Sequence, residues 1–261
     1  IICAFGLAAA APRSPYRHLE LCGIAIENGW CYILPEQSFA VYRHEDKYLL
    51  SPAEAVYLRG LLRGVLTPDA HGDYAIRSLY FDTPDLRDHN EKLLGLRDRK
   101  KLRLRTYSGR REDPVKLEIK NKSENFSHKE TLVITSQEAE SLICGEWGVL
   151  DAYQSTTARR FQNFVKNEGR RPAMLIDYER EAFLCPAQRV RITFDKHIRA
   201  AHSDAFFDPH VPMVGLHSGQ ITVLEVKYDS FLPAYLSRLL SSCCLQHTSV
   251  SKYSTACEFC V

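Results

Sequence analysis

Two neighbouring segments of the chain alternate between apolar and charged side chains. In Lys101–Tyr107, every second residue is basic or aromatic, and the residues between them are leucine or threonine. Val115–Lys122 repeats the alternation, with lysine and glutamate on one face and valine, leucine and isoleucine on the other. Successive side chains of a strand point to opposite faces, so both segments predict strands with one charged face. Gly109 and Asp113-Pro114 lie between them and indicate a turn, which favours antiparallel pairing.

The same kind of pattern predicts six further strands. For a single strand, a charged face exposed to water is the ordinary explanation. Here the pattern recurs, because charged side chains share a face at Arg43, Glu45 and Lys47 and again at Glu225 and Lys227. This recurrence favours a barrel whose interior is polar and cationic. The six further strands are expected at Phe39–Leu50, Tyr74–Asp82, Ser127–Thr135, Ala173–Leu184, Gln188–Ile198 and Ile221–Tyr228.

Helices are expected between and after these strands, which makes the fold class α+β. The clearest begins at Ser51, where Ser51 is the N-cap, Pro52 is the first helical residue and Glu54 completes a capping box. The apolar stripe of this helix is predicted at Ala55, Leu58, Leu62 and Val65. Other helices are expected at 83–94, 136–144, 157–166, 233–241 and 251–259.

Length and composition are those of one large folded domain. The chain has 261 residues, of which 45% are hydrophobic and 25% are charged. Residues 1–37 show no clear periodicity and are interpreted as a poorly ordered extension, so the folded domain is expected at 38–261. The apolar run Ile1–Ala11 is too short to span a membrane, and no other segment of the sequence is a membrane span.

The charge and the cysteines limit the classes of partner. A net charge of +2 argues against nonspecific binding of nucleic acid, so we expect no nucleic-acid partner. The cations are instead concentrated on particular strand faces, where they favour an anionic ligand. Nine cysteines at irregular spacing form no disulfide framework, which indicates a reducing compartment and predicts a cytoplasmic location.

A series of short motifs resembles one known family. They are Arg43–Tyr48, Ser78–Thr83, Lys101–Arg105, Leu117–Lys120, Tyr178–Phe183, Val190–Asp195, Leu224–Lys227 and Ser251–Tyr253, in this order. Together they are similar to the catalytic domain of the vacuolar transporter chaperone (VTC) family, the polyphosphate polymerase domain. That family belongs to the triphosphate tunnel metalloenzymes, which are also called the CYTH-like superfamily. The resemblance covers about residues 39–259. It implies an antiparallel eight-stranded β-barrel that encloses a charged tunnel and is flanked by helices.

The resemblance also implies roles for individual residues. Glu225 matches the metal-binding glutamate of the family, and the cofactor is expected to be Mg²⁺ or Mn²⁺. Glu45 and Glu118 are further candidate metal ligands; the alternative is that both pair with neighbouring cations, since buried charges need partners. Phosphate-binding basic residues with a catalytic role are expected at Lys47, Arg103, Arg105, Lys120, Arg180 and Arg191. Further substrate-binding residues are expected at Lys129, Lys227, Ser251 and Lys252.

Three functions are compatible with this set of residues. The first is a polymerase that transfers the γ-phosphate of ATP to a growing polyphosphate chain, with ATP and polyphosphate as its ligands. The second is a hydrolase of triphosphate or nucleoside triphosphates, and the third is a non-catalytic module that binds polyphosphate. Hydrolytic relatives carry Glu-x-Glu-x-Lys on the first strand, where this chain has Arg43 in place of the first glutamate. That replacement favours the polymerase, because it removes a metal ligand and is expected to add an anion-binding charge. Coupling to transport would require a membrane partner protein.

Overall fold

The chain divides into two compact units, Ile1–Phe39 and Ala40–Val261. The computed structural model describes residues 24–27, 30–33, 43–107, 110–123, 126–186, 189–217, 220–243 and 245–260. In the first unit, β1 (Ile24–Glu27) and β2 (Trp30–Ile33) form an antiparallel pair. The sequence pattern did not indicate this pair. The rest of the predicted extension 1–37, and residues 39–42 of the first predicted strand, lie outside the described residues.

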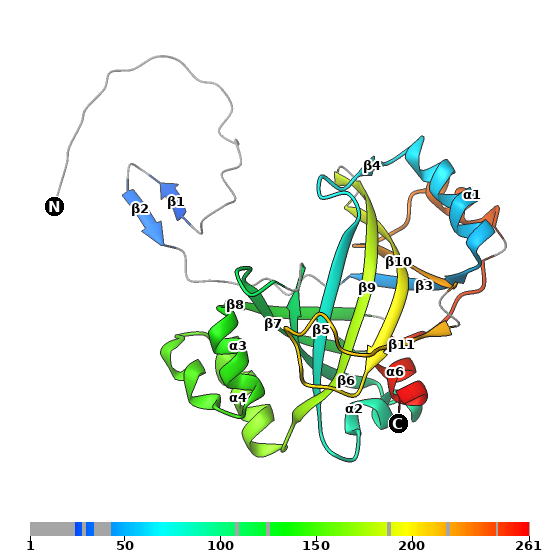
Figure 1. Ribbon diagram of the computed structural model, residues 1–261. Coiled ribbons are helices and arrows are strands. Elements are labelled where there is room, and N and C mark those ends of the chain that lie inside the picture. The colour runs from blue at the N-terminus through cyan, green and yellow to red at the C-terminus, as the bar shows by residue number, and fades with distance from the viewer. Residues whose placement is uncertain are drawn as a thin grey trace. The chain divides into compact units, whose positions relative to one another are not determined.

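The second unit is built on one large antiparallel sheet (Figure 1). Its eight long strands follow the order β3-β12-β10-β9-β5-β6-β7-β8, and every neighbouring pair is antiparallel. All eight correspond to predicted strands, which confirms the antiparallel sheet. Two-residue strands β4 (Thr67–Pro68) and β11 (Val214–Gly215) pair with β9 and β10. The long strands are β3 (His44–Leu50), β5 (Tyr74–Asp82), β6 (Asp98–Thr106), β7 (Val115–Ser123), β8 (Phe126–Ile134), β9 (Arg171–Cys185), β10 (Val190–Ala201) and β12 (Thr222–Tyr228).

The two ends of the strand order, β3 and β8, approach each other. An isolated antiparallel bridge joins Arg43 to Ser127. Side chains add one more link between β3 and β8, since Glu45 accepts a hydrogen bond from Ser127 Oγ at 3.3 Å, and Lys120 Nζ of β7 also donates to Glu45 at 2.8 Å. Among the described residues, the backbone ladder does not run continuously between β3 and β8. The predicted closure into a barrel is therefore not established by backbone hydrogen bonds.

The helices form where local capping chemistry is available. α1 (Pro52–Arg63) has the predicted capping box, in which Ser51 Oγ accepts from Glu54 N and Glu54 Oε2 accepts from Ser51 N. α3 (Ser136–Ile143) begins with an equivalent box at Thr135. The expectation for Val65 was wrong, because α1 ends before it and its side chain is 47% exposed. The remaining helices are η1 (Trp147–Ala152), α4 (Thr156–Asn167), α5 (Ala234–Ser241) and α6 (Lys252–Cys260).

α2 (Arg87–Leu93) begins four residues later than the predicted start at Thr83. The cause is the carboxylate of Asp82, which is buried at the end of β5 and accepts from the backbone N of Thr83 at 2.8 Å and of Asp88 at 3.1 Å. Thr83 Oγ1 also accepts from Arg87 N at 3.0 Å. These bonds satisfy the first backbone donors of α2 from outside the helix. Residues 83–86 therefore form a turn that places α2 beside the sheet.

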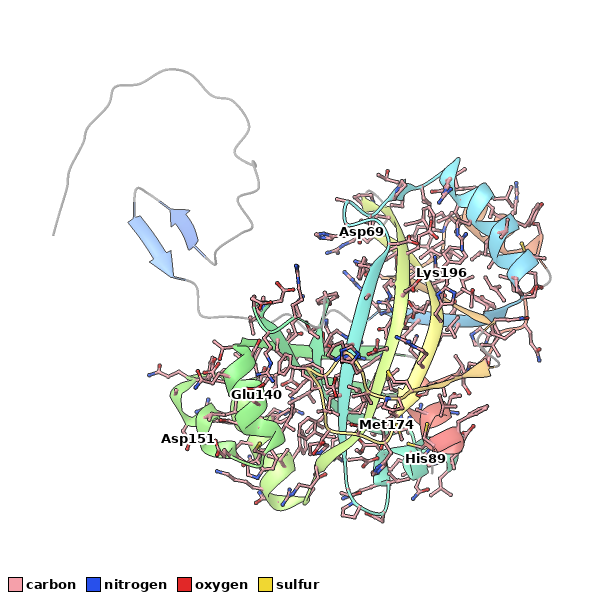
Figure 2. All side chains as sticks on the ribbon, in the orientation of Figure 1. Asp69, His89, Glu140, Asp151, Met174 and Lys196 are labelled. Carbon is pink, nitrogen blue, oxygen red and sulfur yellow. The ribbon has the colours of Figure 1, made fainter. Side chains whose placement is uncertain are left out.

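Helices cover the apolar faces of the strands (Figure 2). α3, α4 and η1 pack on strands β6–β8, where Leu102, Leu117 and Phe161 are fully buried. α1 and α5 cover β3, β10 and β12, and α6 packs against β9 and β10. Each buried leucine or phenylalanine contributes about 1.5–3 kcal/mol relative to an exposed one. The apolar faces predicted from alternation are therefore covered by helices. The charged faces lie on the other side of the sheet.

Two further findings concern membranes and thiols. Of the helices in the described ranges, none is long and apolar enough to cross a membrane. Cys144, Cys243, Cys257 and Cys260 are free thiols.

We expect a chain that begins at Gln37 to keep the melting temperature of the full chain. Among the described residues, all three buried clusters of the second unit are formed by residues at or beyond Tyr48, so the truncation removes none of these side chains. Thermal unfolding of the two proteins, followed by circular dichroism, measures this. A melting temperature lowered by several degrees would contradict the expectation that the extension is dispensable.

Candidate anion-binding site

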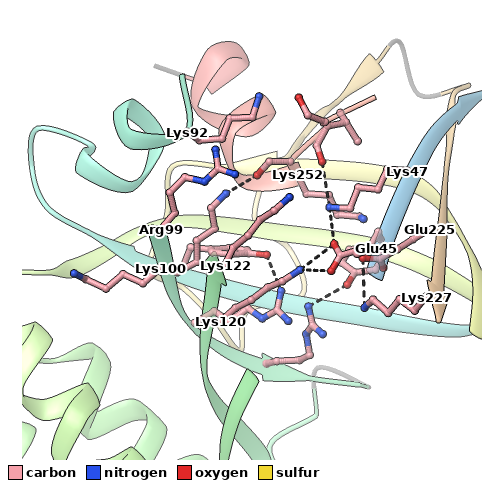
Figure 3. A pocket seen from close by; sticks show the side chains of 18 of the residues that line it. Glu45, Lys47, Lys92, Arg99, Lys100, Lys120, Lys122, Glu225, Lys227 and Lys252 are labelled. Atoms are coloured by element: carbon pink, nitrogen blue, oxygen red, sulfur yellow. Dashed lines mark hydrogen bonds and ion pairs between the residues drawn. The ribbon is translucent and has the colours of Figure 1, made fainter. Parts of the chain in front are cut away.

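A cavity of about 270 Å³ lies on the charged side of the sheet. Strands β3, β5, β6, β7, β9 and β12 contribute to its lining, together with the segment from Ser249 to Lys252. Figure 3 shows its charged side chains converging from these elements. The predicted site residues that line it are Glu45, Lys47, Arg103, Arg105, Lys120, Arg180, Glu225, Lys227, Ser251 and Lys252.

Cations lie directly opposite one another across the strands that form this lining. Lys101 is opposite Lys120, which is in turn opposite Lys129, and Arg99 is opposite Lys122. Like charges in directly opposed positions destabilise a sheet. The arrangement therefore does not serve the stability of the sheet, and an anion that lies between the cations would neutralise it.

Glu118 lies beneath the lining and is fully buried. Its carboxylate accepts from Arg103 at 2.6 Å and from Lys129 at 2.8 Å, and Arg105 Nη1 is 3.7 Å away. Burial opposes its ionisation, but the charges of Arg103, Arg105 and Lys129 outweigh burial and hold the pKa of Glu118 well below its usual value. Glu118 is thus paired with neighbouring cations, which was the alternative to a metal-binding role for this residue.

Asp195 connects two of the predicted phosphate-binding cations. Arg180 donates to both of its carboxylate oxygens, at 2.6 and 2.8 Å, and Lys252 Nζ lies 2.5 Å from Oδ2. Burial opposes ionisation, but the two cations keep the pKa of Asp195 below its usual value. Ser251, which precedes Lys252 in the sequence, accepts a hydrogen bond from Lys101 Nζ at 2.5 Å. The start of α6 is thus held against the charged faces of β6, β9 and β10.

Among the described residues, Glu45 and Glu225 are the two carboxylates that border the cavity, and the charge of Glu45 acts to raise the pKa of Glu225. Lys47 and Lys120 pair with Glu45 at 3.0 and 2.8 Å. Lys227 and Arg180 pair with Glu225 at 3.3 and 3.4 Å. Burial raises the pKa of both carboxyls, but the neighbouring lysines outweigh it and lower both values, so both groups are ionised at neutral pH.

These two carboxylates fit a hard divalent cation. Mg²⁺ is typically held by one or two carboxylates while phosphate oxygens and water complete its coordination. Within the described ranges, no group of three or more His, Cys, Asp or Glu side chains is placed to hold a metal. The donor set of the chain therefore suits a metal that is bound jointly with a phosphate ligand.

Three residues of the predicted set do not line the cavity. Arg191 donates to Asp69 at 2.9 Å and to the Tyr74 hydroxyl at 3.0 Å. In Figure 2, Asp69 lies at the end of the long strands opposite to His89 of α2. Lys129 and Glu118 lie beside and beneath the lining, as described above.

Arg43 also departs from its expectation. Its guanidinium pairs with Asp229 at 2.9 Å, and it is absent from the residues that line the cavity. Arg43 therefore adds no cation to the lining of this cavity. The observation that no glutamate occupies this position stands.

The cavity also contains residues that are not in the predicted set of site residues. Tyr80 accepts from Arg103 Nη1 at 2.9 Å and stacks on Tyr253 of α6 at a centroid distance of 5.0 Å. Burial by itself raises the pKa of Tyr80, but Arg103, Arg105 and Lys101 outweigh it and lower the pKa to about 7. Other added residues are Lys92, Arg99, Lys100, Lys101, Lys122 and Tyr178. Extending the alternation of β6 by one residue pair would have found Arg99, whereas no sequence signal indicates Lys92.

Lys101 predicts a dependence of anion binding on pH. Burial lowers the pKa of its ammonium to about 8; Lys47 and Lys120 act in the same direction, while Tyr80 and Asp88 oppose it. An anion stabilises the charged form, so triphosphate binding should take up protons near pH 8–9, and affinity should fall as pH rises through this range. Calorimetric titrations in two buffers of different ionisation enthalpy measure the uptake. Lys101→Arg, which stays charged, should remove most of it.

The lowered pKa of Lys101 also makes the free energy of unfolding depend on pH. The pKa of Lys101 is about 8 in the folded chain and 10.5 in the unfolded reference. The unfolded chain therefore binds more protons between these values, and the contribution of Lys101 to stability rises with pH across this window. If the proton uptake of the wild type and of Lys101→Arg were equal, Lys101 would not be the titrating group.

The fold and the site define a protein with a large antiparallel sheet, several helices and an interior cationic cavity. The chain belongs to the VTC domain family, whose model matches residues 42–261. This confirms the resemblance found in the sequence. Family membership and the cavity together support a function that concerns phosphate or triphosphate compounds. A comparison with curated proteins finds no match.

Solved structures of similar fold have low identity to this chain. The PH1819 protein of Pyrococcus horikoshii OT3 is 11% identical, with a TM-score of 0.45 over 84% of this chain and 99% of that protein. The capping enzyme triphosphatase of Mimivirus is 9% identical, with a TM-score of 0.41 over 77% of this chain and 88% of that protein.

Proposed function

We propose that this chain is a polyphosphate polymerase that transfers the γ-phosphoryl group of ATP to the end of a phosphate chain. The observation that supports it best is a cavity in which cations outnumber carboxylates and two ionised glutamates, Glu45 and Glu225, face the same space. Phosphoryl transfer needs positioning and charge neutralisation more than covalent chemistry, and this lining supplies both.

The residues of the cavity have distinct parts in the proposed reaction. Arg103, Arg105 and Arg180 offer planar, bidentate donors, and their carboxylate partners hold the guanidinium groups in place. Lys47, Lys120, Lys227 and Lys252 act as point charges around the transferred group. Glu45 and Glu225 would hold Mg²⁺ or Mn²⁺. A bound metal would neutralise charge on the phosphate oxygens.

The proposed step needs no protein base. A terminal oxygen of the chain attacks the γ-phosphorus of ATP, and the bond from that phosphorus to the β–γ bridging oxygen breaks. The bonding electrons leave with ADP. A phosphate monoester has its second pKa near 6, so the attacking oxygen is already ionised at neutral pH. Water, by contrast, must lose a proton when it attacks.

A hydrolase of triphosphate is the second candidate, and Tyr80 is the observation that favours it. Its neighbouring cations lower its pKa to about 7, which makes its phenolate more accessible at neutral pH than that of an ordinary tyrosine, and a phenolate is able to accept a proton from water. It already accepts a hydrogen bond from Arg103, however, which reduces its basicity. The carboxylates of Glu45 and Glu225 are weak bases because their pKa values are lowered.

The products of one incubation distinguish the candidates. The purified chain is supplied with ATP, Mn²⁺ or Mg²⁺ and a short polyphosphate primer, and chain length is followed by gel electrophoresis while ADP and free phosphate are measured. The polymerase predicts longer chains with one ADP for each phosphate added. Free phosphate without longer chains would favour the hydrolase. No consumption of ATP would leave a polyphosphate-binding module.

A further inference from the structure

One side of the cavity carries cations that have no carboxylate partner. Within the described ranges, Lys92, Arg99 and Lys122 form no ion pair, whereas Arg103 and Arg105 on the same face of β6 share Glu118. Figure 3 shows Lys92, Arg99 and Lys122 on the side of the cavity opposite to Glu45 and Glu225. Lys101 of the inner cavity also has no carboxylate partner among the described residues, but it donates a hydrogen bond to Ser251 Oγ.

A second, outer cavity of about 580 Å³ adjoins this side. The two cavities share Arg99, Lys100 and Lys122, and the carboxylates Glu91 and Asp98 also line the outer one. Of the three shared residues, Lys100 is paired, with Glu168 at 3.1 Å. Arg99 and Lys122 are directly opposed on β6 and β7, and burial followed by the charges of Lys47 and nearby Arg99 lowers the pKa of Lys122. An anion bound here would relieve this repulsion, which Glu45 offsets only in part.

The size of the inner cavity bears on what this anion is. Pockets for single small ligands have volumes of about 300–1,000 Å³, and the inner cavity of about 270 Å³ is at or below that range. A phosphate chain that grows by repeated transfer cannot remain inside such a space. Its earlier units must leave through an opening while its end stays at the site of transfer. Every unit that leaves carries negative charge.

We propose that Lys92, Arg99 and Lys122 form a chain-binding mouth that holds the part of a phosphate chain extending beyond the inner cavity. This inference rests on the proposed function, because it assumes a linear polyphosphate as the ligand of the inner cavity. The mouth would bind long chains in preference to short ones. It would keep the product attached between successive transfers.

The test compares the affinity of the full chain for inorganic triphosphate and for linear polyphosphate of about 60 units, without ATP. The variant is the triple substitution Lys92→Ala, Arg99→Ala and Lys122→Ala. The matched control is Arg159→Ala, Lys166→Ala and Arg238→Ala, which removes three exposed helical cations that line neither cavity. Isothermal titration calorimetry at several salt concentrations measures the dissociation constants.

We expect the mouth variant to lose at least tenfold in affinity for the long chain and at most threefold for triphosphate. The control should lose less than twofold for either ligand. The slope of log affinity against log salt for the long chain should decrease by about two to three, since each cation removed abolishes about one phosphate contact. Equal losses for both ligands, or a loss no greater than that of the control, would overturn the proposal.

A lipid surface is the competing ligand, because Leu93, Leu94 and Leu96 are exposed beside Lys92. Vesicles of phosphatidylcholine with and without phosphatidylserine test it by co-sedimentation. If the mouth substitutions abolish binding to anionic vesicles and cause no length-selective loss of affinity for polyphosphate, the ligand of the mouth is a membrane surface and not a phosphate chain. The binding assay contains no ATP, so it is independent of catalysis. If the wild type elongates polyphosphate but the mouth variant loses affinity equally for long chains and triphosphate, the chain-binding mouth alone is overturned. If the mouth variant loses affinity selectively for long chains but the wild type does not elongate polyphosphate, the polymerase proposal alone is overturned.

Discussion

Glu225→Gln is expected to lower the rate of elongation by about 10³-fold or more while the protein stays folded. The amide is nearly the same shape as the carboxylate but carries no charge, so the pair Glu45–Glu225 would lose half of its capacity for a divalent cation. Metal ions contribute several kcal/mol of transition-state charge stabilisation in phosphoryl transfer, and about 1.4 kcal/mol is a factor of ten in rate. Initial rates at saturating ATP over a range of Mn²⁺ concentrations measure the effect.

Glu118→Gln is the matched control, because it changes the same residue type in the same sheet. Glu118 is fully buried between Arg103, Arg105 and Lys129 and does not reach the cavity lining. Breaking a buried ion pair by removing one partner costs about 3–5 kcal/mol. We therefore expect a lower melting temperature but an unchanged metal concentration for half-maximal rate in the protein that remains folded. An unaltered rate and metal dependence in Glu225→Gln would remove Glu225 from the metal site.

The pH dependence of the stability supplied by Glu118 follows from its lowered pKa. A carboxyl whose pKa is lower in the folded chain contributes stability that is present above its unfolded pKa of about 4.3. That contribution decreases as pH falls toward the folded value. The wild type should therefore lose more stability in acid than Glu118→Gln does.

Lys252→Ala is expected to lower the elongation rate by about 10²- to 10³-fold with only a small loss of stability. This is the typical effect of removing one preorganised donor from a site that stabilises developing charge. The fold should survive because Asp195, the partner of Lys252 at 2.5 Å, keeps both of its bonds to Arg180. Steady-state kinetics and thermal unfolding of the same preparation separate the two effects.

Lys196→Ala provides the comparison for this variant. Lys196 follows Asp195 on β10 and pairs with Asp73 at the surface at 2.9 Å. It does not line the inner cavity, so its loss should leave the rate within about twofold of the wild type. Surface ion pairs of this kind contribute about 0–1 kcal/mol. If both lysine variants lowered the rate equally, the effect would come from the overall charge of the protein.

The charge-reversing variant Arg103→Glu illustrates what the structure adds to a sequence argument. Alternation along β6 places Arg103 on the charged face, and from that fact alone a reversal should affect only the ligand. In the structure Arg103 is 2.6 Å from the buried carboxylate of Glu118. A glutamate at this position would place two carboxylates together in a buried site, so we expect the reversal to destabilise the fold as well.

The sequence by itself determined the strands, their faces and the family. Alternation in Lys101–Tyr107 and Val115–Lys122 was sufficient because a strand has a period of two, so each side chain's face follows from its position. The capping box of Ser51 and Glu54 was equally local, since its bonds lie within three residues. The ordered motifs predicted the VTC family, and the family model confirms it.

Only the tertiary structure decided which charged residues act together. Glu118 and Glu225 have the same sequence signal, yet Glu118 is buried under three cations and Glu225 borders the cavity, because their cross-strand neighbours differ. Lys92 of α2 lines the cavity, and the first turn of this helix is bound to the carboxylate of Asp82 in β5. Arg43 lies outside the cavity lining and pairs with Asp229, 186 residues away in the sequence. Pairing between distant segments determines these positions, and the sequence of a single strand does not show which residues it pairs with.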